Sequence, residues 1–139
     1  EIDRLVRHYH SVKPDYAFNH IPKLGNSYVN GLGAEVLSSD LLYRIAETTQ
    51  DQRHQEHVTI YLWDNAENYD IQTLKAPTEY SYPDILLDVS TKDDLDFLTR
   101  NLGNSSSADV KPEDYDVTTM IQSILQERKI EGSHPRFNP

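Results

Sequence analysis

Apolar residues recur at helical spacing in four segments of the chain. In segment 1–12 they fall on one helical face, and the Lys-Pro pair that follows ends the helix. The same spacing predicts three further helices: after the Ser-Ser-Asp cap at 38–40, after the acidic cap at 91–94, and over 113–128. The helices alone account for about a third of the chain, and shorter apolar runs lie between them.

These shorter runs predict β-strands at 15–19, 34–37, 69–74 and 85–89. The run at 57–63 is rich in Val, Ile, Tyr and Trp and favours a strand, but a short helix over 58–65 is the open alternative because brief apolar runs are ambiguous. Strands therefore alternate with helices, which is typical of an α/β fold. The Pro-, Gly- and Asn-rich stretch at 22–33 is a loop long enough to carry function.

The 139 residues fit a single domain followed by an appendage. We predict a folded portion over 1–102, then a Ser-rich linker over 103–112. An amphipathic helix over 113–131 and a patternless tail over 132–139 complete the chain.

Charge and composition exclude several classes of function. The chain has 13 Lys+Arg against 23 Asp+Glu, a net charge of −10, which argues against binding nucleic acid or an anionic membrane. It has no cysteine, so disulfide frameworks, thiolate metal sites and cysteine nucleophiles are excluded. Without an apolar run long enough to cross a bilayer, the protein is expected to be soluble and cytoplasmic.

Four motifs in order resemble a known family. They are D-Y-A-F-N at 15–19, G-L-G-A-E-V-L-S at 31–38, E-H-V-T at 56–59 and L-D-V-S-T-K-D-D-L at 87–95. They look like the C-terminal half of the cytidylyltransferases of the spore-coat polysaccharide biosynthesis type, related to CMP-KDO synthetase and acylneuraminate cytidylyltransferase. Each motif alone is weak, whereas four in sequence at similar separations are specific.

The resemblance implies a fold and an activity. The fold would be the C-terminal part of a three-layer αβα sandwich with a mixed sheet, of the nucleotide-diphospho-sugar transferase type. The activity would be transfer from CTP to a sugar or sugar acid, giving a CMP-sugar and pyrophosphate with Mg²⁺ as cofactor, in a homodimer joined through the strands at 15–35 and 69–74. In this family the phosphate-binding loop lies in an N-terminal half that this chain does not contain. A non-catalytic binding module derived from the fold is therefore the alternative.

The resemblance also assigns residues, none of them as a catalytic group. It implies that the following contact the substrate: Asn19, Gly31, Glu35, Glu56, His57 and Thr59. For Glu35 and His57 a structural reading stays open, because a strand carboxylate can simply point to water and a lone histidine is often a partly exposed structural residue.

Asp88 and Ser90 are the weak candidates for a metal site. They lie two apart at the end of a predicted strand, so both side chains point to one face. The family's acid in this turn aligns with Ser90, which brings no negative charge to Mg²⁺, and Asp88 lies one pleat away on the same face. A structural role for Asp88 is the alternative. A zinc site at His8 and His10 is excluded, because residues two apart on a helix diverge by about 200°.

Overall fold

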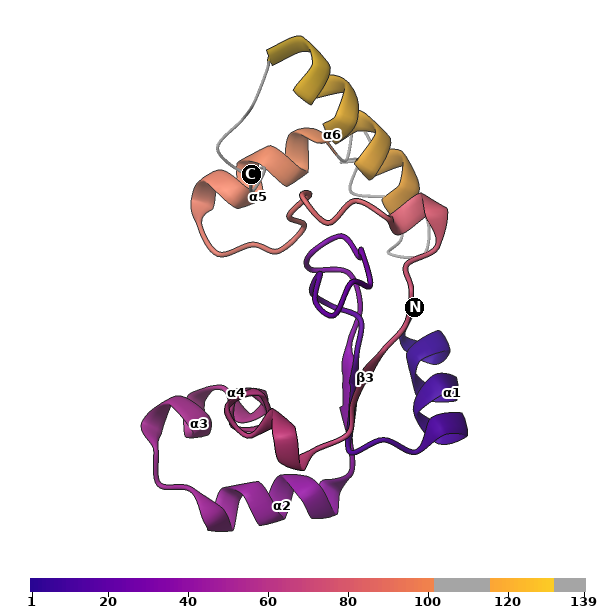
Figure 1. Cartoon of the computed structure of the whole chain (residues 1–139). Helices are drawn as coiled ribbons and strands as arrows, with labels where there is room; N and C mark the ends of the chain where they lie inside the picture. Colours follow the sequence, from indigo (N-terminus) through magenta and orange to yellow (C-terminus); the bar gives the residue numbers. More distant parts are fainter. Residues whose placement is uncertain (102–115, 132–139) are drawn as a thin grey trace, which may run out of the picture. The chain divides into compact units, whose positions relative to one another are not determined.

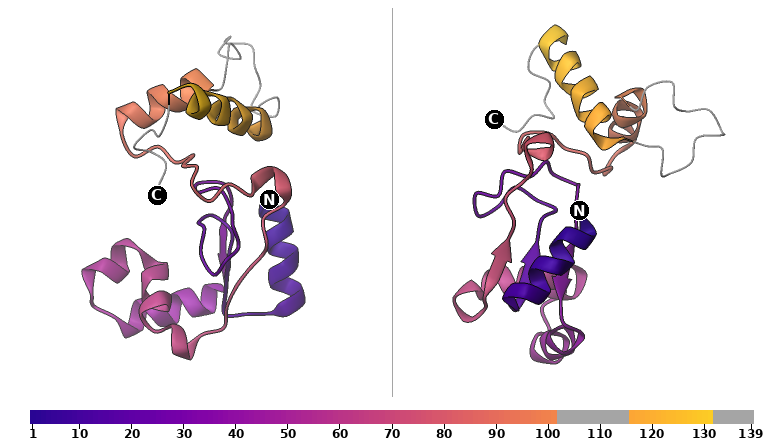
Figure 2. Two further views of the ribbon diagram at one scale, coloured as in Figure 1. Left: turned by 45° about the horizontal axis from the view of Figure 1, so that its top comes forward. Right: turned by 90° about the vertical axis from the view of Figure 1, so that its right-hand side faces the viewer.

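The computed structural model describes residues 1–101 and 116–131 and divides them into two compact units (Figures 1 and 2). Unit 1 consists of Glu1–His20 and Gly33–Lys75, and unit 2 of Ile21–Leu32 and the described residues from Ala76 onward. Each unit is held by its own packing and is described separately. The predicted linker and tail lie outside the described residues.

A three-stranded mixed sheet forms the centre of unit 1. Its strands are β1 (Tyr16–Phe18), β2 (Glu35–Leu37) and β3 (Ile71–Thr73), in the order β2-β1-β3. The central strand β1 runs antiparallel to β2 and parallel to β3. All three strands lie within runs predicted as strands, and the predicted α/β class with a mixed sheet is confirmed.

Helices cover both faces of this sheet (Figure 1). Their bounds are α1 Ile2–Val12, α2 Ser39–Thr48, α3 Gln52–Glu56 and α4 Val58–Asp64. The side chains of Tyr16 and Phe18 point to one face, where both rings meet the indole of Trp63 on α4 edge-on, at centroid distances of 6.1 and 5.3 Å. Helix α1 contacts β1 and β2 on the other face. Unit 1 therefore has three layers.

Segment 57–63 forms helix α4 rather than the favoured strand, so the helical alternative is correct. Helical spacing places Leu62 in the core and turns Trp63 onto the sheet, and a strand would point these neighbours to opposite faces. Tertiary packing therefore decides an apolar run whose periodicity is ambiguous. Helix α3 has no buried residue and begins where the Asp51 side chain accepts a hydrogen bond from the Arg53 N–H, and no helix was predicted there.

Two helices and a long connecting segment build unit 2 (Figure 2). Helix α5 (Lys92–Asn101) and helix α6 (Val117–Glu131) contact each other, and the 3₁₀ turn η2 (Thr78–Tyr80) contacts α6. Their apolar faces enclose a buried core made of Val29, Ile85, Phe97, Leu98, Ile121 and Ile124. Both helices fall where apolar spacing predicts them; residues 113–115 of the last predicted helix lie outside the described residues.

The predicted strand at 85–89 is wrong. Within the described residues the segment forms one isolated bridge, between Leu86 and Asn30, in which the Leu87 N–H donates to the Asn30 carbonyl at 2.8 Å and the Asn30 N–H donates to the Ile85 carbonyl at 2.9 Å. The ladder cannot lengthen because Ser27 and Gly31 on the partner segment have positive φ, which turns that segment away from extended geometry. Asp88 is consequently exposed and needs no buried partner.

Among the described residues, no helix combines the length and apolar character needed to cross a membrane.

Candidate functional site

A cluster of polar groups forms around the hydroxyl of Tyr16 in unit 1. In the antiparallel pairing of β1 and β2, Phe18 lies directly opposite Glu35, so Tyr16, Phe18 and Glu35 share one face of the sheet. The Tyr16 hydroxyl donates a hydrogen bond to Oε1 of Glu35. The strand acid predicted to contact substrate is therefore fixed by a buried tyrosine of the neighbouring strand.

Two side chains of α4 also reach the Tyr16 hydroxyl. Hydrogen bonding from Thr59 and Trp63 acts to lower the pKa of this hydroxyl, and the Trp63 indole meets the Tyr16 ring edge-on at a centroid distance of 6.1 Å. Burial has the larger effect and, together with the hydrogen bond to Glu35, raises the pKa of Tyr16 far above its usual value. Tyr16 therefore keeps its proton throughout the physiological range, and its neutral hydroxyl donates a hydrogen bond to Glu35.

His20 lies beside the same carboxylate. Its Nε2 is 3.7 Å from Oε1 of Glu35, and its ring meets the Phe18 ring edge-on at 6.0 Å. The side chains of His20 and Glu35 are 29% and 35% exposed. The Nδ1 atom of His20 is buried and has no hydrogen-bond partner among the described residues. The carboxylate of Glu35 and the imidazole of His20 are thus partly exposed to solvent, and they lie over the buried rings of Tyr16 and Phe18.

Asn19 supports this cluster from behind. It is fully buried, its Oδ1 accepts the Ala34 backbone N–H at 2.9 Å, and its Nδ2 donates to Oε2 of Glu1 at 3.3 Å. A side chain on Gly33 would come within 2.6 Å of the Asn19 carbonyl oxygen, so glycine is required there. The amide of Asn19 is used inside the fold, and its contact with substrate stays a prediction.

Glu56 and His57 lie on the surface where α3 meets α4. Their side chains are 71% and 62% exposed, and they form only a loose pair at 3.9 Å. Of the E-H-V-T motif it is Thr59 that reaches Glu35, through the Tyr16 hydroxyl. Substrate binding by Glu56 and His57 stays a prediction.

In unit 2 the structure brings Gly31 against Asp88. A Cβ atom on Gly31 would lie 2.6 Å from the Asp88 nitrogen and 2.9 Å from the Leu87 carbonyl carbon, and the residue has a φ of 89°. The Ser90 hydroxyl donates to Oδ2 of Asp88 at 3.4 Å, so the two candidate metal ligands are neighbours. Asp94 next to them accepts the backbone N–H groups that open α5. Within the described part of the chain, no group of three or more His, Asp or Glu side chains is arranged to hold a metal ion.

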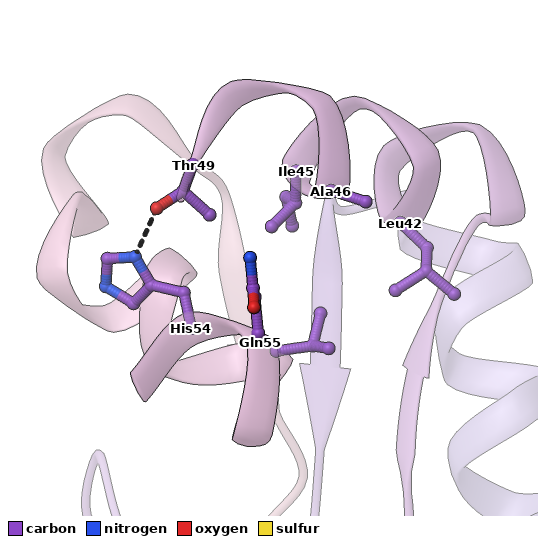
Figure 3. A pocket seen from close by; sticks show the side chains of 7 residues that line it. Leu42, Ile45, Ala46, Thr49, His54 and Gln55 are labelled. Atoms are coloured by element: carbon purple, nitrogen blue, oxygen red, sulfur yellow. Dashed lines mark hydrogen bonds between the residues drawn. The ribbon is translucent and has the colours of Figure 1, made fainter. Parts of the chain in front are cut away.

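A separate pocket of about 300 Å³ lies between α2 and the α3–α4 pair (Figure 3). Its lining residues are mostly apolar: Leu42, Ile45, Ala46, Thr49, His54, Gln55 and Val58. The His54 ring is already used by the fold, with Nδ1 2.9 Å from the Thr49 hydroxyl and Nε2 3.0 Å from Asp64. The pocket therefore offers less polar chemistry than the surface at Glu35.

Three residues of the Glu35 cluster were not singled out from the sequence: Tyr16, His20 and Trp63. The signal for two of them is present, because Tyr16, Phe18 and His20 alternate and so share a face at period two. The sequence gives no such signal for Trp63, because its segment is expected to form a strand.

Comparison with known proteins places this geometry in context. No protein-family model matches the chain. The Bacillus subtilis spore coat polysaccharide biosynthesis protein SpsF is 35% identical over 68 residues, which are 48% of this chain and 28% of SpsF. A cytidylyltransferase from Leptospira borgpetersenii superposes with a TM-score of 0.71 at 17% identity, over 98% of this chain and 54% of that one. The fold is that of a cytidylyltransferase.

The predicted resemblance to cytidylyltransferases of the spore-coat type is thereby confirmed in sequence and in fold. The chain spans only about a quarter of SpsF and about half of the Leptospira cytidylyltransferase. That it corresponds to a C-terminal half stays a prediction.

Proposed function

We propose that this chain forms part of a sugar nucleotidyltransferase, which converts CTP and a sugar or sugar acid into a CMP-sugar and pyrophosphate for polysaccharide or glycan synthesis. The fold of the Leptospira cytidylyltransferase and the sequence likeness to SpsF support this class of protein. The observation that carries the proposal within the chain is the Glu35 cluster, a half-exposed carboxylate set on buried aromatic rings.

This cluster suits a sugar better than the apolar pocket does. A carboxylate accepts hydrogen bonds only, and sugar hydroxyls are donors that match it. All the hydrogen bonds and ion pairs of Glu35 within the described residues go to Oε1, so Oε2 is available to a ligand hydroxyl. His20 lies next to it and supplies a second polar group, whose Nε2 is 3.7 Å from Oε1 of Glu35.

In the proposed reaction, a sugar oxygen attacks the α-phosphorus of CTP. A bond forms from that oxygen to phosphorus, the α–β phosphoanhydride bond breaks, and pyrophosphate leaves with the bonding electrons. The proton of the attacking hydroxyl passes to solvent or a base. The role of Glu35 in this scheme is to orient the sugar, which lowers the entropic cost of bringing the two substrates together.

Asp88 and Ser90 are the residues that would hold Mg²⁺. Mg²⁺ commonly uses one or two carboxylates together with waters and substrate phosphates, and an exposed carboxylate next to a hydroxyl fits one side of such a set. When bound, the ion would neutralise negative charge on the phosphates.

Sugar binding can be measured through the single tryptophan, because the Trp63 indole packs edge-on against the Tyr16 ring of the cluster at a centroid distance of 6.1 Å. We expect a saturable change in Trp63 fluorescence with one sugar of a panel, lost in Glu35→Gln and retained in the control Glu47→Gln on the exposed face of α2. If no sugar produces a saturable change, or if both variants respond alike, the sugar site is not at Glu35.

Turnover is tested separately, by pyrophosphate release from CTP, Mg²⁺ and the sugar that binds. Release that depends on this sugar supports the transferase. Binding without release, also in the longest form of the protein that the gene encodes, supports instead the non-catalytic binding module.

A further inference from the structure

We propose that Tyr16 is a positioning residue. Its hydroxyl hydrogen-bonds to one carboxylate oxygen of Glu35, which leaves the other oxygen as the acceptor for a single ligand hydroxyl. The role in sugar recognition rests on the proposed function, whereas the hold of Tyr16 on Glu35 is independent of it.

The Tyr16 hydroxyl has one proton to donate and lone pairs that accept. The indole N–H of Trp63 can only donate, so in any hydrogen bonding between the two side chains the Tyr16 oxygen is the acceptor. Glu35 in its ionised form can only accept. The single proton of Tyr16 is therefore directed at Glu35, and donation from α4 strengthens it through cooperative polarisation.

Within the described residues, the direct hydrogen bond that orients the Glu35 side chain comes from Tyr16. In the part of the chain that the structure describes, β2 is an edge strand paired with β1 alone, so no second strand there restrains its side chains. His20 is 3.7 Å from the same oxygen, beyond direct hydrogen-bond distance. Without the Tyr16 hydroxyl, the half-exposed Glu35 side chain would sample several rotamers. The entropic cost of ordering this side chain on binding would then lower the affinity for the ligand.

Among residues 1–101 and 116–131, few groups face Glu35. Tyr16 and His20 approach from β1 and the residues after it, and Thr59 and Trp63 act on Tyr16 from α4. Helix α1 packs on the opposite face of the sheet. A change at Tyr16 is therefore transmitted to Glu35 directly, without rearranging another charged element.

The first test is made without a ligand. The lone indole N–H of Trp63 gives a single NMR resonance, and Glu35→Gln should shift it through the Tyr16 hydroxyl, whereas Glu47→Gln should not. Tyr16→Phe should shift it further and speed its exchange with solvent. An indole resonance unchanged in Glu35→Gln would overturn the positioning role.

The second test compares the sugar that binds with its deoxy analogues. Tyr16→Phe should lower affinity about tenfold, as expected for loss of an ordered hydrogen bond to a charged group. It should also abolish discrimination against one deoxy analogue that wild type rejects, which a purely structural change would not do. Wild-type affinity and discrimination in Tyr16→Phe overturn the proposal.

Two controls keep the outcomes separate. Tyr43→Phe changes an exposed tyrosine of the same unit and should behave as wild type. If Tyr16→Phe does not fold, Thr59→Val removes one donor to Tyr16 and should produce the same changes at smaller size. If the wild-type protein binds no sugar, the proposed function fails. The indole resonance alone then shows whether Tyr16 orients the Glu35 side chain.

Discussion

The two groups of candidate residues are held in place by different means. In the Glu35 cluster of unit 1, side chains from β1, β2 and α4 bond to one another around the Tyr16 hydroxyl. At the Gly31–Asp88 contact of unit 2, two backbone segments lie in close contact, whereas the Asp88 side chain is exposed. The first arrangement fixes the direction of a carboxylate, and the second fixes only the position of the chain that carries one.

This difference determines how each site should respond to substitution. Where side chains fix one another, an isosteric change alters function while the backbone stays. Where backbones meet, the carboxylate can be removed at little cost in stability, and the glycine beneath it cannot be changed.

The largest effect is expected for Gly31→Ala. Its Cβ, whose position is fixed by the backbone of residue 31, would lie 2.6 Å from the Asp88 nitrogen, a backbone atom that cannot rotate away. Crowding and the positive φ together should lower the free energy of unfolding by about 2–4 kcal/mol, measured by urea denaturation. Asp88→Ala is the matched control and should change it by less than about 0.5 kcal/mol. Equal effects of the two changes would mean that side chains, not backbone, hold this turn.

Asn19→Ala is expected to come next. The change leaves the Ala34 N–H without its 2.9 Å acceptor in a buried part of the fold. We expect a loss of about 1–3 kcal/mol in unfolding free energy, the usual cost of an unsatisfied buried donor. Asn68→Ala, in an exposed 3₁₀ turn of the same unit, should be nearly neutral. A stable Asn19→Ala variant that no longer binds sugar would instead place Asn19 in the ligand site.

The sequence predicts the elements of this fold better than their contacts. Local signals were enough for α1, α2 and α5, where apolar spacing and caps such as Ser38 agree with the packing. They failed at 57–63 and 85–89, where the outcome depends on what the segment packs against: the sheet for α4, and a partner segment with positive φ for the stretch before Asp88.

The candidate site shows the same limit. The motif resemblance selected Glu35 and Thr59 from segments far apart, and the structure joins them through Tyr16. The motifs do not indicate a functional role for Tyr16, because a tyrosine in a strand is interpreted as a core residue until the register of β1 and β2 is known. Pairing register is a tertiary property, and no local pattern of side chains determines which hydroxyl meets which carboxylate.

A smaller effect is expected at the start of α5. Asp94 accepts the N–H groups of Ser90 and Thr91 at 3.0 and 2.6 Å, and the Thr91 hydroxyl accepts the Asp94 N–H at 3.2 Å. Removing this reciprocal cap in Asp94→Ala should cost about 1 kcal/mol and speed amide exchange in the first turn of α5. Asp93→Ala, at the exposed neighbouring position, should not affect exchange there. Unchanged exchange in Asp94→Ala would show that the packing of α5 alone holds the turn beside Asp88.

The smallest effect is a dependence of stability on pH that arises in unit 1. The hydrogen bond from His54, helped by Arg53, lowers the pKa of Asp64 below its ordinary value of 3.8. A carboxyl with a lowered pKa stabilises the fold above its ordinary pKa and loses that contribution as pH falls through the folded value. Asp64→Asn should therefore be less stable than wild type at pH 6, and the difference should shrink steadily as the pH falls below about 4.

Asp116 in unit 2 supplies the matched comparison for that experiment. Its pKa is also lowered, but by the Thr119 hydroxyl and the Thr118 N–H at the start of its own helix. Asp116→Asn should therefore change amide exchange at the start of α6, whereas Asp64→Asn should change it in α3, which the His54 bond ties to α4. If Asp64→Asn remains equally destabilised from pH 6 to pH 3, the ionised carboxylate is not what holds α3 to α4. The packing of His54 against the Tyr61 ring, at a centroid distance of 5.3 Å, must then hold it.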